Sequence, residues 1–197
     1  VNAYNNVIIQ DNIEDLLIFA ENITYLRNKE KIFTEGETKA VFQSKYNFKS
    51  KDTTLLRNQK ILQSLERTVV TDDDDTVYNL DNFEYLIEKK LLKGNNVNII
   101  TNFNKDKSDK FIFSSGIFNL QNKKFSGKDT KVLLHKNIFQ KEKEKFLELI
   151  EKTEINKLVD EKKVFENEPR LYGVSSSGDV DKTIVKKGIF TSCKKNY

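Results

Sequence analysis

The sequence predicts an all-β fold, and three observations support that prediction. Short stretches of alternating apolar and polar residues recur along the chain, the pattern of strands with one apolar face. They are rich in β-branched and aromatic residues, and the 197 residues include 14 Phe and 7 Tyr. Polar turns separate them, with no helical stretch before residue 140. This pattern is typical of a sandwich, a jelly roll or a solenoid, and it argues against a doubly wound parallel sheet.

A weak internal repeat organises the strands, with copies at residues 22–36, 82–94 and 116–127. Each copy reads as a strand, a charged turn, a second strand and a glycine. The closing glycine suits a bend or a bulge, where a side chain would be in the way. Further strands are expected at residues 7–9, 16–20, 39–42, 46–48, 68–71, 97–100 and 111–113.

One segment departs from this pattern. Residues 140–162 are dense in Glu and Lys, and their apolar residues recur at nearly helical spacing. We therefore expect a short amphipathic helical insertion in the β-domain there. A charged surface excursion is the simpler interpretation, and a partner-binding helix is the alternative.

The composition argues against several classes of function. Lys and Arg number 34 against 30 Asp and Glu, and both signs are mixed along the chain, unlike a nucleic-acid footprint. The single histidine, His135, and the single cysteine, Cys193, have no visible third catalytic partner. The run 72–75 lacks the spacing of a calcium loop and reads as a solvated turn. No acidic residue stands in an apolar setting. We expect no enzyme activity, no metal and no cofactor.

The ends of the chain suggest a fragment. It begins at Val1 and contains no Met, and no window carries the ~18 apolar residues of a membrane helix.

Two features resemble a known family. The strand–turn–strand–glycine repeat resembles the OstA-type β-domain shared by proteins of the lipopolysaccharide transport bridge. Residues 168–179 (EPRLYGVSSSGD) and 187–195 (KGIFTSCKK) look like the stretch that closes the periplasmic domain before the barrel in the LptD (OstA/Imp) family. Together the two features cover most of the chain, and residues 140–162 fit poorly.

This resemblance implies a twisted, open β-jelly roll that forms a single periplasmic domain over residues 1–197. Residues 163–197 would lead to a missing C-terminal barrel in the outer membrane of a Gram-negative bacterium. The inner face would hold the acyl chains of lipopolysaccharide. An LptA-like bridge protein would join the N-terminal edge, and an LptE-like lipoprotein would associate through the barrel. Cys193 would form a disulfide with a later part of the chain in the oxidising periplasm.

Apolar residues at alternate strand positions are the candidates for the groove lining. They are Ile23, Tyr25, Phe33, Phe42, Phe83, Tyr85, Ile99, Phe111, Phe113, Phe118, Leu120 and Phe125. Each could instead be a plain core residue.

Two other functions remain open. One is a soluble bridge protein of the same family, which would not need the barrel junction seen at residues 168–195. The other is a structural β-solenoid, such as an adhesin stalk, without lipid cargo. A solenoid should keep a constant repeat length, whereas the stretches 25–36, 85–94 and 120–127 become shorter along the chain.

Overall fold

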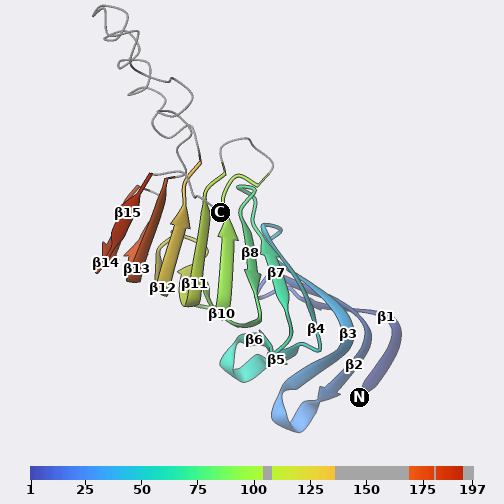
Figure 1. Cartoon of the computed structure of the whole chain (residues 1–197). Helices are drawn as coiled ribbons and strands as arrows, with labels where there is room; N and C mark the ends of the chain where they lie inside the picture. The colour runs from blue at the N-terminus through green and yellow to red at the C-terminus, as the bar shows by residue number, and fades with distance from the viewer. Residues whose placement is uncertain (104–107, 136–168, 180, 193–197) are drawn as a thin grey trace, which may run out of the picture.

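The computed structural model describes residues 1–103, 108–135, 169–179 and 181–192, and its strands all belong to one sheet (Figure 1). The prediction of an all-β fold is confirmed. The only helices among the described residues are two short 3₁₀ turns, η1 (Arg27–Lys29) and η2 (Arg57–Gln59). The expected helical insertion at 140–162 and Cys193 lie outside the described residues.

The strands follow each other along the chain with short connections. They are β1 (Asn2–Asp11), β2 (Leu16–Leu26), β3 (Lys31–Phe42), β4 (Tyr46–Lys51), β5 (Thr54–Leu56), β6 (Ile61–Ser64), β7 (Thr68–Thr71), β8 (Val77–Leu80), β9 (Asn82–Leu86), β10 (Leu91–Ile100), β11 (Lys110–Asn119), β12 (Phe125–Leu133), β13 (Arg170–Gly178), β14 (Thr183–Lys186) and β15 (Ile189–Thr191). Every pairing among them is antiparallel, unlike the parallel pairing of a β-helix.

The sheet is folded over on itself. The first part of β3 pairs with β5 and its second part with β4, and β10 likewise pairs with β9 and then with β8. We call β5, β6, β9, β14 and the parts of the long strands beside them half-sheet 1. Half-sheet 2 comprises β4, β7, β8, β15 and the parts of the long strands beside those. The half-sheets join along a bend, and the side opposite the bend, where the turns lie, is the mouth.

The repeat is more regular than the sequence suggested, because it has a fourth copy. That copy, at residues 54–64, comprises β5, η2 and β6. The turn residues Glu30, Lys60 and Lys90 are 30 positions apart, and each has a left-handed φ. The backbone N–H groups of Arg57 and Ile87 donate to the carbonyls of Glu30 and Lys60, at 3.0 and 2.9 Å. Successive turns therefore stack along half-sheet 1, and a shrinking repeat is no longer an argument against a solenoid.

The alternation of inward and outward residues slips by one position at the bend. In β10 the inward positions are Gly94 and then Val97, and in β12 they are Gly127 and then Thr130. The left-handed residues Asn96 and Asp129 take up the extra position. Both halves of each strand can therefore turn their apolar residues to the same interior.

Glycines line the bend where three long strands are adjacent. Gly94 lies opposite Gly116, which lies opposite Gly127, in the register of β10, β11 and β12. A Cβ on Gly127 would overlap the ring of Phe113. The glycines that close two of the sequence copies thus let Leu80 pack on the backbone at Gly94 and the Phe113 ring pack on it at Gly127.

We expect Gly127→Ala to lower the free energy of unfolding by about 1–3 kcal/mol, because the added methyl overpacks the core against Phe113. Urea denaturation of the purified chain measures this. Ser126→Ala, on the exposed face of the same strand, should change the stability by less than about 0.5 kcal/mol. Equal effects at the two positions would contradict tight packing at the bend.

The N-terminal edge of the sheet is β1. Residues 16–20, one of the two strands expected nearest that edge, lie inside the sheet, because β2 pairs with β1 on one side and with β3 on the other. Ile18 of β2 is fully buried, whereas Tyr4 and Ile8 of β1 are exposed.

Candidate functional site

The structure divides the twelve groove candidates into three groups. Six lie in or against the core on the side of β1 to β9 and around the turn after β11: Ile23, Tyr25, Phe42, Phe83, Tyr85 and Leu120. Five line a cavity towards the C-terminal strands: Ile99, Phe111, Phe113, Phe118 and Phe125. The remaining one, Phe33, alternates with the buried Ile32 and Thr34 and lies on the outer face, under the ammonium group of Lys31 at 4.2 Å.

Three residues of the first group, Phe42, Phe83 and Tyr85, form a packed aromatic centre together with Phe48. The rings of Phe42 and Tyr85 are 4.9 Å apart, and Phe48 stands 5.1 Å from Tyr85 and 5.5 Å from Phe83. Residues of half-sheet 1 and half-sheet 2 meet directly here. The interior of this part of the fold is therefore filled by the protein's own side chains.

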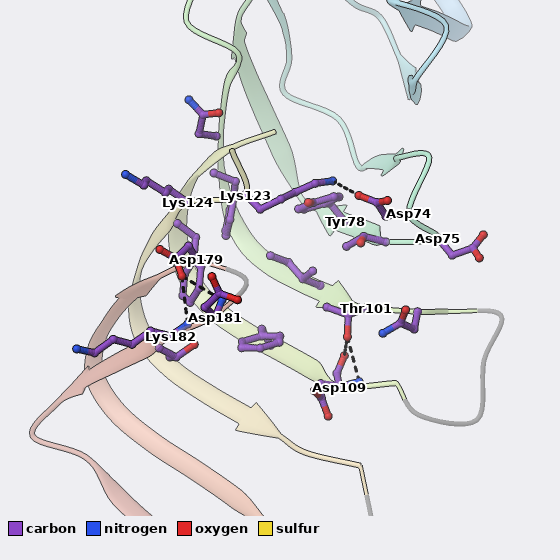
Figure 2. A pocket seen from close by; sticks show the side chains of 18 of the residues that line it. Asp74, Asp75, Tyr78, Thr101, Asp109, Lys123, Lys124, Asp179, Asp181 and Lys182 are labelled. Atoms are coloured by element: carbon purple, nitrogen blue, oxygen red, sulfur yellow. Dashed lines mark hydrogen bonds and ion pairs between the residues drawn. The ribbon is translucent and has the colours of Figure 1, made fainter. Parts of the chain in front are cut away.

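The cavity lies where the half-sheets no longer meet (Figure 2). Its volume is about 850 Å³, within the range of small-molecule sites. Its floor is formed by Tyr78, Ile99 and the aromatic residues of β11 and β12. The rings of Phe111 and Phe113 are both 5.9 Å from that of Phe125, and Phe111 and Phe125 are only partly buried. Phe111 and Phe125 thus leave part of the aromatic floor uncovered, whereas Phe113, Phe118 and the other floor residues are buried.

The rim of the cavity is charged. It carries six aspartates and three lysines: Asp73, Asp74, Asp75, Asp109, Asp179, Asp181, Lys123, Lys124 and Lys182. They come from turns at the mouth, with 73–75 on half-sheet 2 and 179–182 on half-sheet 1 (Figure 2). A molecule in this cavity would meet apolar groups inside and polar groups at the entrance.

One carboxylate beside the cavity, that of Asp72, is buried among polar partners. The Asp72 side chain has no exposed surface. It accepts hydrogen bonds from the backbone N–H groups of Asp74 and Thr76, at 3.0 and 2.9 Å, and from the Lys123 ammonium at 2.6 Å. The Tyr78 hydroxyl is 3.4 Å away. The interpretation of 72–75 as a solvated turn therefore fails at its first residue.

Lys123 joins the two half-sheets across the mouth. It extends from the turn between β11 and β12 to Asp72 and also to Asp74, at 3.0 Å. Burial acts to lower the pKa of Lys123, but the hydrogen bonds that its ammonium donates to the two carboxylates outweigh this effect, and the pKa is raised. Burial, together with the charge of Asp72, raises the pKa of Tyr78. Lys123 therefore remains charged, and Tyr78 neutral, at physiological pH.

Two further contacts close the mouth nearer the N-terminus. The Tyr46 hydroxyl of β4 donates to the carbonyl of Leu120, at 3.0 Å. Lys60, in the turn after η2, pairs with Glu14 of the turn between β1 and β2, at 2.7 Å. It also pairs with Glu88 at 2.9 Å, and these hydrogen bonds raise the pKa of Lys60. The mouth is therefore bridged at two further places between the β1–β2 turn and Lys123.

His135 has a structural partner. Its Nδ1 atom is 2.9 Å from Oδ1 of Asp109, which also accepts the backbone N–H of His135. Within the described residues no group of three or more His, Cys, Asp and Glu side chains is placed to hold a metal ion. Across the same residues, no helix has the length and apolar character needed to cross a membrane.

Comparison with known proteins gives likenesses among solved structures. No model of a known protein family matches the chain, and no curated protein matches it. Among solved structures it is similar to LptH of Pseudomonas aeruginosa, described as the LptA-homologous periplasmic component of the lipopolysaccharide transport device. The TM-score is 0.49 at 11% identity, over 57% of this chain and 81% of that one. At this distance, fold and function must be argued from the chain itself.

Sequence reasoning missed Asp72, Tyr78 and Lys123 for different reasons. Asp72 stands in a run of four aspartates, and the run gives no sign that its first residue is buried. Lys123 is one of two adjacent lysines in a polar turn, 51 positions from Asp72. For Tyr78 there was a usable signal, because it alternates with Leu80 in β8.

Proposed function

We propose that this chain is the periplasmic lipid-carrying domain of an outer-membrane lipopolysaccharide-assembly protein. It receives lipopolysaccharide from a periplasmic bridge and passes the acyl chains along its apolar interior towards a membrane barrel. The observation that carries the proposal is the cavity beside Phe111, Phe113 and Phe125, where an aromatic floor opens at the mouth of a folded sheet. It supports an apolar ligand with a polar end.

The energetics suit a carrier whose binding surface is extended. Burying acyl chains gives about 0.8 kcal/mol per CH₂, so one ~12-carbon chain gains on the order of 10 kcal/mol. A single deep pocket of that strength would retain its lipid. Successive strands can present similar apolar side chains, which we call rungs, at matching positions. An acyl chain can then leave one rung as it reaches the next. The stacked 30-residue copies supply such rungs at corresponding positions, such as Leu55, Tyr85 and Phe118.

The resemblance of residues 168–195 to the closing stretch of the LptD family supports the outer-membrane assignment over a soluble bridge protein. The described part of this stretch continues the sheet as β13, β14 and β15. The barrel, the LptE-like lipoprotein and a disulfide at Cys193 rest on that resemblance alone.

An LptA-like partner would join the sheet at β1. This edge strand offers backbone groups for strand addition, and its Tyr4 and Ile8 side chains are exposed. The left-handed Asn5 and Asn6 interrupt its pairing with β2, so residues 7–11 form the straight part that is suited to a partner strand.

Site-specific photo-crosslinking tests the lipid proposal. A photoreactive residue at Phe111 or Phe125, both partly buried in the cavity, is expected to capture lipopolysaccharide in cells that produce the full-length protein. Ile117 lies on the same strand as Phe111 but on the outer face, 45% exposed, and should capture none. Capture at Ile117 but not at Phe111 or Phe125 would contradict the proposal. Absence of lipid A after extraction of the purified chain would favour a structural β-solenoid.

A further inference from the structure

We propose that the ion-pair bridge formed by Asp72, Lys123 and Asp74 determines how far an acyl chain can enter the interior. On its C-terminal side lies the open cavity, and on its N-terminal side lies the packed aromatic centre. Lys123 is then a positioning residue that separates a lipid-accepting compartment from a closed one. This inference rests on the proposed lipid-carrying function and goes beyond it by assigning the boundary.

The bridge spans the mouth where the two compartments meet. Asp72 and Asp74 belong to the turn between β7 and β8, and Lys123 to the turn between β11 and β12. Asp74 and Lys123 both line the cavity, and Lys123 has only 21% of its side chain exposed. Figure 2 shows Lys123 reaching towards Asp74 beside the cavity, and Asp72 lies buried on the same ammonium group.

The mouth differs on the two sides of this bridge. Towards the N-terminus, the pairs Glu14–Lys60 and Tyr46–Leu120 also cross it. Towards the C-terminus, among the residues that the structure describes, no ion pair or hydrogen bond joins the connection after β10 to the turn 179–182. The Asp109 carboxylate is engaged by His135, and the Asp109 backbone N–H donates to the Thr101 hydroxyl. Asp179 accepts the N–H groups of Asp181 and Lys182 within its own turn. Among the described residues, the Asp109 and Asp179 carboxylates are thus engaged on their own sides of the mouth and do not bridge it.

The closed compartment holds one unsatisfied group that favours opening. The Tyr85 hydroxyl is buried and has no hydrogen-bond partner among the described residues, although the ring packs against Phe42 and Phe48. A buried hydroxyl without a partner destabilises the state that buries it. Parting the half-sheets would let water form a hydrogen bond with this hydroxyl. The buried hydroxyl therefore lowers the stability of the closed packing, which then depends on the contacts at the mouth.

Movement of an acyl chain between the two compartments therefore requires the bridge to open. A chain moving between the compartments must separate Lys123 from Asp72 and Asp74 before it can reach Phe42, Phe83 and Tyr85. Removing the bridge should let chains reach the closed compartment, and replacing the Tyr85 hydroxyl should favour closure.

The test uses lipid A with a diazirine in one acyl chain, photo-crosslinked to the whole purified chain and mapped by mass spectrometry. In the wild type, we expect crosslinks on Phe111 and Phe125 and few on Phe42, Phe83 and Tyr85. In Lys123→Ser, the ratio of closed-compartment to cavity crosslinks should rise by about tenfold, as for the loss of a closure worth about 1.4 kcal/mol. Tyr85→Phe should lower the ratio.

Lys45→Ser is the matched control, because Lys45 pairs with Asp73 at 3.5 Å between two turns of half-sheet 2 and does not cross the mouth. Its ratio should equal that of the wild type. If Lys123→Ser does not fold, the charge-free double variant Asp72→Asn/Lys123→Met takes its place. An unchanged ratio in the folded variant, or equal labelling of both compartments in the wild type, overturns the boundary but leaves the lipid function intact. Labelling of neither compartment overturns the lipid function and this inference with it.

Discussion

Phe42→Ala is expected to lower the free energy of unfolding by about 3–5 kcal/mol, the cost of a large-to-small change in a well-packed core. Phe42 has no exposed surface, and its ring lies 4.9 Å from Tyr85 and 5.5 Å from Phe48. The two half-sheets meet at this cluster, so the cavity left by alanine would lie between them. Urea or thermal denaturation of the purified chain measures the change.

Phe33→Ala is the matched control for that experiment. Both phenylalanines belong to β3 and both were candidates for the inner groove, but Phe33 lies on the outer face under Lys31. Its loss removes a partly exposed ring and one cation–π contact, so we expect a cost of about 0.5–1 kcal/mol. Similar costs for the two substitutions would show that the two residues do not lie on opposite faces.

The second large loss of stability is expected at the ion-pair bridge between Lys123 and Asp72. Lys123→Met leaves the Asp72 carboxylate buried without its cation, and we expect it to destabilise the fold by about 2–3 kcal/mol. The cost stays below the ~3–5 kcal/mol typical of a fully buried pair, because the N–H groups of Asp74 and Thr76 still bind the carboxylate. Chemical denaturation near neutral pH measures this loss.

The double variant Asp72→Asn/Lys123→Met tests the reason for that cost. The asparagine carbonyl oxygen can still accept both backbone N–H groups, and no buried charge remains. The double variant should therefore be more stable than Lys123→Met alone, by about 1 kcal/mol. Additive losses would mean that the two side chains do not act as a pair.

The repeating strand–turn–strand unit could be predicted from the sequence because it is local. In the copies at 22–36, 82–94 and 116–127, alternation and a polar turn fix the hairpin without any long-range information. The copy at 54–64 was missed because Ser64 stands where Gly94 stands in the next copy. Its turn shares Leu, Arg and Asn with the first copy, at 26–28 and 56–58, and that shared triplet was the available signal.

The face of the sheet on which a strand residue lies was harder to predict from the sequence. At 32–33 two apolar residues are adjacent, and alternation alone does not say whether Ile32 or Phe33 points inward. The slip at the bend adds to this difficulty. Positions such as Gly94 and Val97 both face the interior although they are three residues apart. A pattern with period 2 cannot be continued through a left-handed residue such as Asn96.

The sequence by itself determined that this chain is a β-protein of repeated hairpins with one apolar face, because period-2 alternation and turn chemistry act over a few residues. Only the tertiary structure decided that the apolar face is a packed core on one side of Lys123 and an open cavity on the other. That division depends on contacts between half-sheets, such as Phe42 with Tyr85 and Asp72 with Lys123. Their partners are 43 and 51 positions apart, so the packing that unites them leaves no local trace in the sequence.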